Sequence, residues 1–120
     1  MGDKFQLALV IEDEADLAFM CSEALKAAGF ETEVIRDGLQ AQARLAEVTP
    51  QVVVLDLHLP GLDGRLLLRQ INEDARLAST RVIVTTADPV LAEAVRRDAT
   101  MTLLKPVSFT QLRDLAKKVT

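Results

Sequence analysis

Short apolar runs that recur along the chain place the strongest limit on what it can fold into. Four of them lack polar alternation: LALVI (7–11), VVVL (52–55), VIV (82–84) and LL (103–104). Runs of this kind are typical of parallel strands that other elements cover on both faces. A fifth segment, ETEVIR (31–36), is more polar, as expected of a strand at the edge of a sheet.

Segments with helical spacing of apolar residues separate these runs. Helices are predicted over 15–28, 38–47 and 63–73, and two more begin after the cap residues Asp88 and Ser108. The side chains expected to face the core are Leu17, Met20, Cys21, Ala24 and Ala28 in the first helix, Leu39, Ala43 and Ala46 in the second, Leu67, Leu68 and Ile71 in the third, Leu91, Ala94 and Val95 in the fourth, and Leu112, Leu115 and Val119 in the fifth.

The regular alternation of strand and helix predicts an α/β fold of the (βα)₅ type. Short buried strands joined by helices form a doubly wound parallel sheet with right-handed crossovers. With 120 residues and no linker-like segment, the chain is expected to form one domain over 1–120. Ligands of such folds bind beyond the carboxyl ends of the strands, where the strand order reverses.

Composition excludes several classes of partner. The net charge is −4 and aromatic residues make up 3% of the chain, so neither a basic surface nor a stacking platform for nucleic acid is expected. A single cysteine, Cys21, rules out an internal disulfide and fits a reducing compartment. The sequence has no signal-peptide pattern and no apolar stretch near the ~20 residues of a membrane helix. We therefore expect a cytoplasmic domain that binds neither nucleic acid nor membrane.

Polar and charged side chains stand where the predicted strands end. Glu12 and Asp13 follow the first run, Asp56 follows VVVL, Thr86 lies just after VIV, and Lys105 follows the last run. In a parallel sheet these groups meet at one edge. Carboxylates about 4 Å apart repel by about 4 kcal/mol at an effective dielectric constant near 20, so they favour a bound cation. Oxygen ligands without sulfur or imidazole favour Mg²⁺, and the whole set suits phosphoryl transfer.

These motifs resemble those of one family, the receiver domain of bacterial two-component response regulators. The resemblance spans residues 7–119 and rests on Glu12-Asp13, on VVVLDLHLPGLDG (52–64), on TTA (85–87) and on KP (105–106). The motifs stand in the family's order, at the family's spacing, each at a predicted strand end. The resemblance implies the flavodoxin-like strand order 2-1-3-4-5, an order that periodicity does not give.

The resemblance also implies a role for each acidic residue. Asp56 is similar to the aspartate that attacks the phosphorus of a phosphohistidine. Glu12 and Asp13 are similar to the acidic pair that holds Mg²⁺, and Asp56 and the backbone carbonyl of His58 complete the protein ligands. The cofactor implied is therefore Mg²⁺.

The remaining matched positions concern the phosphoryl oxygens. By resemblance, Thr86 donates its hydroxyl to one oxygen, the backbone N–H of Ala87 assists, and Lys105 pairs with another oxygen. The Lys105-Pro106 bond resembles the family's cis peptide, which costs an X–Pro bond little. Thr85 is the competing candidate for the hydroxyl role, although strand alternation turns it to the opposite side from Thr86.

The function implied is that of a phospho-acceptor signalling domain. A sensor histidine kinase or a histidine phosphotransfer protein would transfer phosphate to Asp56, and the change would switch protein interactions. Such a domain catalyses only its own phosphorylation and dephosphorylation, so it is not an enzyme in the ordinary sense. The chain is expected to be a stand-alone regulator or one domain of a longer protein, with its downstream target or fused output domain open.

Two positions depart from the family pattern. Thr102 stands three residues before Lys105, where the family usually has Tyr or Phe, so the aromatic side chain that responds to the phosphorylated site is missing. Asp98 stands where Gly is common, which predicts a rebuilt turn before the last strand. These departures bear on how a signal is transmitted and leave the chemistry of the site unchanged.

Other functions fit the sequence less well. A receiver-like interaction module that signals without phosphorylation is the main alternative, and Thr102 favours it. A phosphatase of the haloacid dehalogenase type needs a second aspartate two residues after the first, where this chain has His58. His58 is otherwise expected to be a polar surface residue or a side chain that shields the acceptor from water. A nucleotide or flavin site is disfavoured, because the acidic loop after the first run has no glycine-rich phosphate cradle.

Overall fold

A computed structural model describes residues 6–119. In chain order the elements are β1 (Leu7–Ile11), α1 (Ala15–Ala27), β2 (Glu31–Ile35), α2 (Gly38–Leu45), β3 (Val52–Asp56), α3 (Gly64–Glu73), the short 3₁₀ helix η1 (Ala75–Leu77), β4 (Arg81–Thr86), α4 (Pro89–Ala94), β5 (Met101–Leu104) and α5 (Phe109–Val119). Strand and helix alternate as predicted, and every predicted element is present. Within these residues, no helix is long and apolar enough to cross a membrane.

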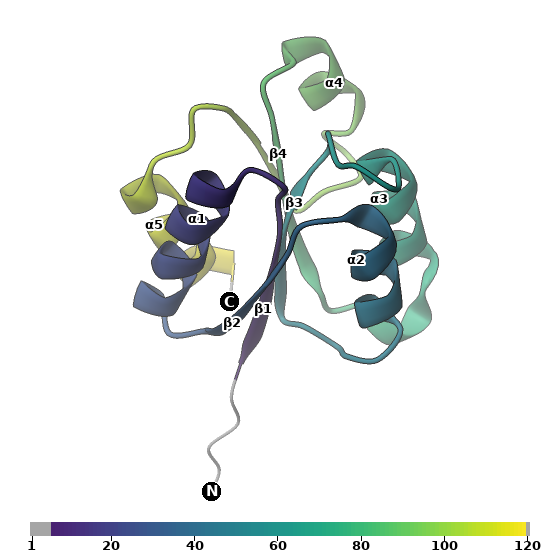
Figure 1. Ribbon diagram of the computed structural model, residues 1–120, viewed down its shortest axis with the longest axis horizontal. Helices are drawn as coiled ribbons and strands as arrows, with labels where there is room; N and C mark the ends of the chain where they lie inside the picture. Colours follow the sequence, from purple (N-terminus) through teal and green to yellow (C-terminus); the bar gives the residue numbers. More distant parts are fainter. Residues whose placement is uncertain (1–5, 120) are drawn as a thin grey trace, which may run out of the picture.

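The strands form a single parallel sheet in the order β2-β1-β3-β4-β5 over the described residues, so the expected α/β fold and strand order are confirmed. Helices cover both faces: α1 and α5 lie together on one side, and α2 and α3 on the other (Figure 1). The order reverses at β1, which pairs with β2 on one side and β3 on the other. The carboxyl ends of β1 and β3 are therefore neighbours.

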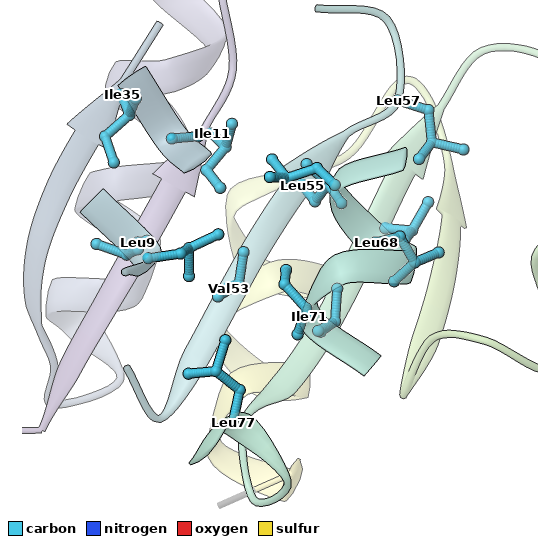
Figure 2. Packing of buried hydrophobic residues seen from close by; sticks show 14 of the residues in the cluster. Leu9, Ile11, Ile35, Val53, Leu55, Leu57, Leu68, Ile71 and Leu77 are labelled. Carbon is cyan, nitrogen blue, oxygen red and sulfur yellow. The ribbon is translucent and has the colours of Figure 1, made fainter. Parts of the chain in front are cut away.

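Alternate residues of β1, β3 and β4 enter two separate cores. Leu9, Val53 and Leu55 belong to the core on the α2 and α3 side, where they pack with side chains such as Leu68 and Ile71 (Figure 2). Their sequence neighbours in the central strands, among them Ala8, Val10, Val52 and Val54, belong to the core under α1 and α5. Burial on both faces explains why these runs show no polar alternation.

The structure corrects the expected inner face of α2. Leu39 is 55% exposed, and Ala43 and Ala46 are exposed as well. The buried residues of this helix are Gly38, Ala41 and Leu45. The apolar pattern alone misassigned the face because Gly38 packs against Leu62, whose Cβ lies 2.6 Å from where a Cβ on Gly38 would be. Only the fold brings that close neighbour into place.

The predicted inner face of α3, with Leu67, Leu68 and Ile71, is confirmed. In α4, Leu91 is half-buried and Ala94, the last residue of the helix, is exposed. Val95 is buried, but it follows the helix as its C-cap. In α1 and α5 the side chains expected to face the core are buried or half-buried. They are Leu17, Met20, Cys21, Ala24 and Ala28 in α1, and Leu112, Leu115 and Val119 in α5.

β3, β4 and β5 extend one or two residues beyond the predicted apolar runs, because backbone hydrogen bonding between strands continues into neighbouring positions. β3 includes Asp56, β4 extends to Arg81 and Thr86, and β5 begins at Met101. β2 ends at Ile35, one residue before the end of the predicted segment. The helices predicted over 15–28, 38–47 and 63–73 are one or two residues shorter in the structure.

The helix caps predicted at Asp88 and Ser108 are present in the structure. The Asp88 carboxylate accepts the N–H of Val90 at 2.9 Å. At the start of α5 the predicted capping box is present: Gln111 N–H donates to Ser108 Oγ at 3.0 Å, and Ser108 N–H to Gln111 Oε1 at 3.5 Å. These bonds satisfy backbone groups that have no partner within the helix.

The turn before β5 is rebuilt without a left-handed residue. Among the described residues, positive φ occurs only at glycines, so Asp98 adopts an ordinary φ. Its N–H donates to the Val95 carbonyl at 2.9 Å, and its own carbonyl accepts from Asn72 Nδ2 at 2.8 Å. The peptide bond between Lys105 and Pro106 is cis, as expected.

Candidate functional site

The carboxyl edge of the sheet gathers the side chains singled out in the sequence. Glu12 follows β1, Asp56 is the last residue of β3, Thr86 is the last residue of β4, and Lys105 follows β5. β3 lies between β1 and β4, so Asp56 is at the centre of this group. Asp13 continues the loop that leaves β1.

Glu12 and Asp56 are each 2% exposed and share one cation. Lys105 Nζ lies 3.1 Å from Glu12 Oε1 and 3.2 Å from Asp56 Oδ2. A buried carboxylate is costly unless it is paired and hydrogen-bonded. When both carboxylates are ionised, the single ammonium of Lys105 balances only one of the two negative charges.

A third carboxylate completes an oxygen-rich cluster. Asp13 is exposed, and one carboxylate oxygen each from Glu12, Asp13 and Asp56 lie within 4.8 Å of one another. Arg36 Nε donates to the Asp13 backbone carbonyl at 2.8 Å and fixes the loop that carries it. Three carboxylates with one of them open to solvent fit the needs of a hard divalent cation, which keeps some of its water ligands.

Burial and neighbouring charges change the acidity of two groups. Burial, together with the charge of Asp56, raises the pKa of Glu12 from its ordinary 4.5 to about 7, although the Glu14 N–H bond and Lys105 act in the opposite direction. Burial alone would lower the pKa of Lys105, but the charges of Asp56 and Glu12 outweigh it and the pKa is raised. The raised pKa means that Glu12 can take up a proton near neutral pH.

This shift predicts a pH-dependent stability in the presence of a chelator. Between pH 4.5 and 7 the folded chain keeps a proton on Glu12 that the unfolded chain has released, so the free energy of unfolding should fall as pH rises through this window. The effect is at most about 3 kcal/mol, and denaturant titration at several pH values measures it. Glu12→Gln should flatten this part of the profile; identical profiles for the two proteins would contradict the shift.

The Thr86 hydroxyl lies on the β3 side of the site. Thr86 Oγ1 accepts the N–H of Asp88 at 3.1 Å and lies 3.5 Å from His58 Nε2. The Thr86 side chain is fully buried, whereas His58 and Ala87 are exposed. The structure thus connects Thr86 to the loop after β3.

That loop is fixed to the acidic residue itself. The N–H of His58 donates to Asp56 Oδ1 at 3.0 Å, so one Asp56 oxygen is held by the loop and the other faces Lys105. Gly64 closes the loop: a Cβ at this position would lie 2.6 Å from Leu57 Cα, closer than any side chain allows. Glycine is therefore required where α3 begins.

Three features of the site were not predicted. Arg36 was placed in the β2 strand, yet its guanidinium supports the Asp13 loop. Lys105 was expected to face a phosphoryl oxygen, and here it bridges two carboxylates. The approach of His58 to Thr86 joins residues 28 positions apart, which no local pattern reveals. Glu14 caps α1 by accepting the Leu17 N–H at 2.9 Å.

The β5 position that departs from the family pattern holds a small polar side chain. Thr102 is half-buried, and its hydroxyl is the one buried side-chain polar atom without a hydrogen-bond partner among residues 6–119. Its neighbour Met101 is 42% exposed. No aromatic group stands beside Thr86 at this edge of β5.

Comparison with known proteins agrees with the fold. The curated protein "DNA-binding response regulator MtrA" of Mycobacterium tuberculosis is 43% identical over 70 residues, covering 58% of this chain and 31% of MtrA. The chain spans less than half the length of the curated relatives it matches.

Solved structures give the same picture. The chemotaxis response regulator CheY4 of Vibrio cholerae has a TM-score of 0.87 at 22% identity, covering 98% of this chain and 100% of that one, which shows the shared fold. The Mn(2+)-bound form of response regulator Rcp1 has a TM-score of 0.79 at 26% identity, covering 95% of this chain and 91% of that one. The family model described as the response regulator receiver domain matches residues 8–117. With this match over nearly its whole length, the chain belongs to the response regulator receiver domain family of two-component systems.

Proposed function

We propose that this receiver domain accepts a phosphoryl group on Asp56 from a histidine kinase or a histidine phosphotransfer protein. The observation that carries the proposal is the ion bridge from Lys105 Nζ to Glu12 and Asp56, at 3.1 and 3.2 Å, in a buried acidic cluster. This arrangement places a carboxylate at the edge of the sheet with a cation beside it. Both are needed for nucleophilic attack on phosphorus.

Mg²⁺ is the proposed cofactor, and the donor set fits it. Glu12, Asp13 and Asp56 would hold the ion through their clustered carboxylates, with the backbone carbonyl of His58 as a further ligand. The bound ion would supply positive charge that offsets the carboxylates and the incoming phosphate. The solved structure of Rcp1 in a Mn(2+)-bound form supports a divalent ion in a related protein.

The protein's own residues account for the transfer. An Asp56 carboxylate oxygen bonds to phosphorus as the P–N bond of the phosphohistidine breaks, and the electron pair of that bond returns to the imidazole. Lys105 Nζ turns from the carboxylates toward a phosphoryl oxygen, while the Thr86 hydroxyl and the Ala87 N–H donate to others. In the later hydrolysis, water attacks phosphorus, the P–O bond to Asp56 breaks, and inorganic phosphate leaves, which restores the Asp56 carboxylate. The domain thus modifies only itself, as a switch for protein interactions.

A receiver-like module that signals without phosphorylation is the second candidate. Thr102 favours it, because β5 then lacks the aromatic side chain that could move in response to phosphorylation of the site. The complete set of Glu12, Asp56, Thr86 and Lys105 favours phosphorylation instead.

Intact mass measurement separates the candidates. The protein is incubated with a small phosphodonor, such as an acyl phosphate, in Mg²⁺ or in a chelator. We expect one phosphoryl adduct in Mg²⁺ and none in the chelator, because the charges of the cluster repel the donor when no cation is present. Absence of an adduct in Mg²⁺ would favour the interaction module, and repeated turnover of phosphate esters would favour a phosphatase.

A further inference from the structure

The Thr86 hydroxyl has two competing uses. It carries a single proton, and its oxygen already accepts the Asp88 N–H at 3.1 Å. That proton can be donated to His58 Nε2, 3.5 Å away, when this ring nitrogen is the unprotonated one. A hydroxyl that donates to His58 is not free to donate to a phosphoryl oxygen on Asp56.

His58 is tied to both partners of this exchange. Its backbone N–H donates to Asp56 Oδ1 at 3.0 Å, while its ring contacts Thr86. The contact to Thr86 is at the long end of the hydrogen-bond range, so a small shift of the hydroxyl toward Asp56 ends it. The exposed His58 ring then has no partner on β4 that holds it in place.

The segment after His58 carries such a change to α2. The Pro60 carbonyl accepts the N–H of Gly38 at 2.9 Å. A Cβ on Gly61 would lie 2.7 Å from Asp37 Oδ2, and one on Gly38 would lie 2.6 Å from Leu62 Cβ. The loop therefore packs directly on the first residues of α2, without space between them.

On the other side of Thr86, the side chain of Thr102 on β5 makes no comparable hydrogen bond in the described part of the chain. Thr102 is short, and its hydroxyl has no hydrogen-bond partner within residues 6–119. A movement of Thr86 has no aromatic side chain to draw inward there. The side-chain contacts of Thr86 thus lead to Asp88, ahead of α4, and to the loop after β3, and not to the hydroxyl of Thr102.

We propose that His58 is the positioning residue that senses the state of Thr86 and transmits it through residues 59–62 to the start of α2. This inference rests on the proposed phosphorylation of Asp56. In the unphosphorylated chain His58 holds the Thr86 hydroxyl. On phosphorylation Thr86 turns to the phosphoryl oxygen, His58 is released, and the loop shifts against Asp37 and Gly38.

Nuclear magnetic resonance tests the proposal on the intact chain. In the free chain, before any ligand is added, the ¹⁵N chemical shift of His58 Nε2 should be that of an unprotonated ring nitrogen. Adding Mg²⁺ and beryllofluoride, a mimic of the phosphoryl group, should move the His58 ring signals and the amide signals of residues 59–62 and 38–40. Signals of β5 around Thr102 should move less. A protonated Nε2 in the free chain, or changes confined to β5 and α4, would overturn the proposal.

Variants separate positioning from a structural role. His58→Ala should place the amide signals of residues 38–40 near their beryllofluoride-bound positions without the ligand. It should also speed phosphorylation by an acyl phosphate about threefold, as expected from losing one weak competing hydrogen bond. His58→Gln keeps an acceptor at similar reach and should restore wild-type behaviour, and Thr102→Ser should have no effect.

The outcomes also separate this inference from the proposed function. A wild-type chain that binds beryllofluoride and forms the phosphoryl adduct with unmoved 38–40 amides would overturn only the role of His58. A chain that forms neither complex in Mg²⁺ would overturn both. His58→Ala with wild-type amide positions and rates would also overturn the role of His58.

Discussion

Asp56→Asn is expected to abolish the phosphoryl adduct that the wild-type chain forms with a small phosphodonor in Mg²⁺. The amide has nearly the shape of the carboxylate and can still accept the His58 N–H, but it lacks the charged oxygen that attacks phosphorus. Intact mass at matched times measures the loss. Peptide mapping of the wild-type adduct should place it on the segment that contains Asp56.

The variant should remain folded, which makes the result interpretable. Asn at this position removes one of two buried negative charges, so the repulsion that helps raise the pKa of Glu12 disappears. Without Mg²⁺ the thermal midpoint should be at least that of wild type. Asp16→Asn, at an exposed position in the first turn of α1, is the matched control and should form the adduct normally. A wild-type yield of adduct in Asp56→Asn would place the acceptor on another residue.

Leu55→Ala is expected to lower the free energy of unfolding by about 2–5 kcal/mol, the range for truncating a fully buried leucine. Leu55 is 0% exposed, and it packs between β3 and the side chains of α3 (Figure 2). The cavity left behind cannot collapse easily, because the neighbouring strands fix the backbone on both sides. Urea denaturation followed by circular dichroism measures the change.

Leu66→Ala removes the same atoms from the outer side of α3. Leu66 is 38% exposed, so its truncation should cost less than about 1 kcal/mol. The difference between the two variants isolates burial from the change in side-chain type. Equal losses would mean that the buried core contributes no more to stability than the surface of the helix, which would contradict the packing of helices on both faces of the sheet.

The alternation of elements could be predicted because it depends on local patterns. A strand covered on both faces must be apolar at successive positions, and 52–55 shows this clearly. Caps such as Asp88 depend only on residues two or three positions away. The strand order was different: periodicity left it open, and it came from resemblance to a family before the structure confirmed it.

The side of α2 shows the limit of such patterns. Leu39 and Ala43 form an apolar stripe, yet they are exposed, whereas Gly38 and Ala41 are buried. Small residues carry little signal in a hydrophobic pattern, but they are the ones that allow close approach. The choice of face was decided by the loop near Leu62, which is distant in sequence.

Local patterns in the chain are enough to predict the class of fold and the kinds of side chain at the strand ends, because both follow from the periodicity of short segments. Which of these groups form ion pairs and hydrogen bonds with one another depends on the packing of the whole fold. Lys105 bridges Glu12 and Asp56, and Thr86 approaches His58, since four separate strands end at one edge. Such distances depend on packing between remote segments, and Coulomb energies and hydrogen bonds change steeply over an ångström.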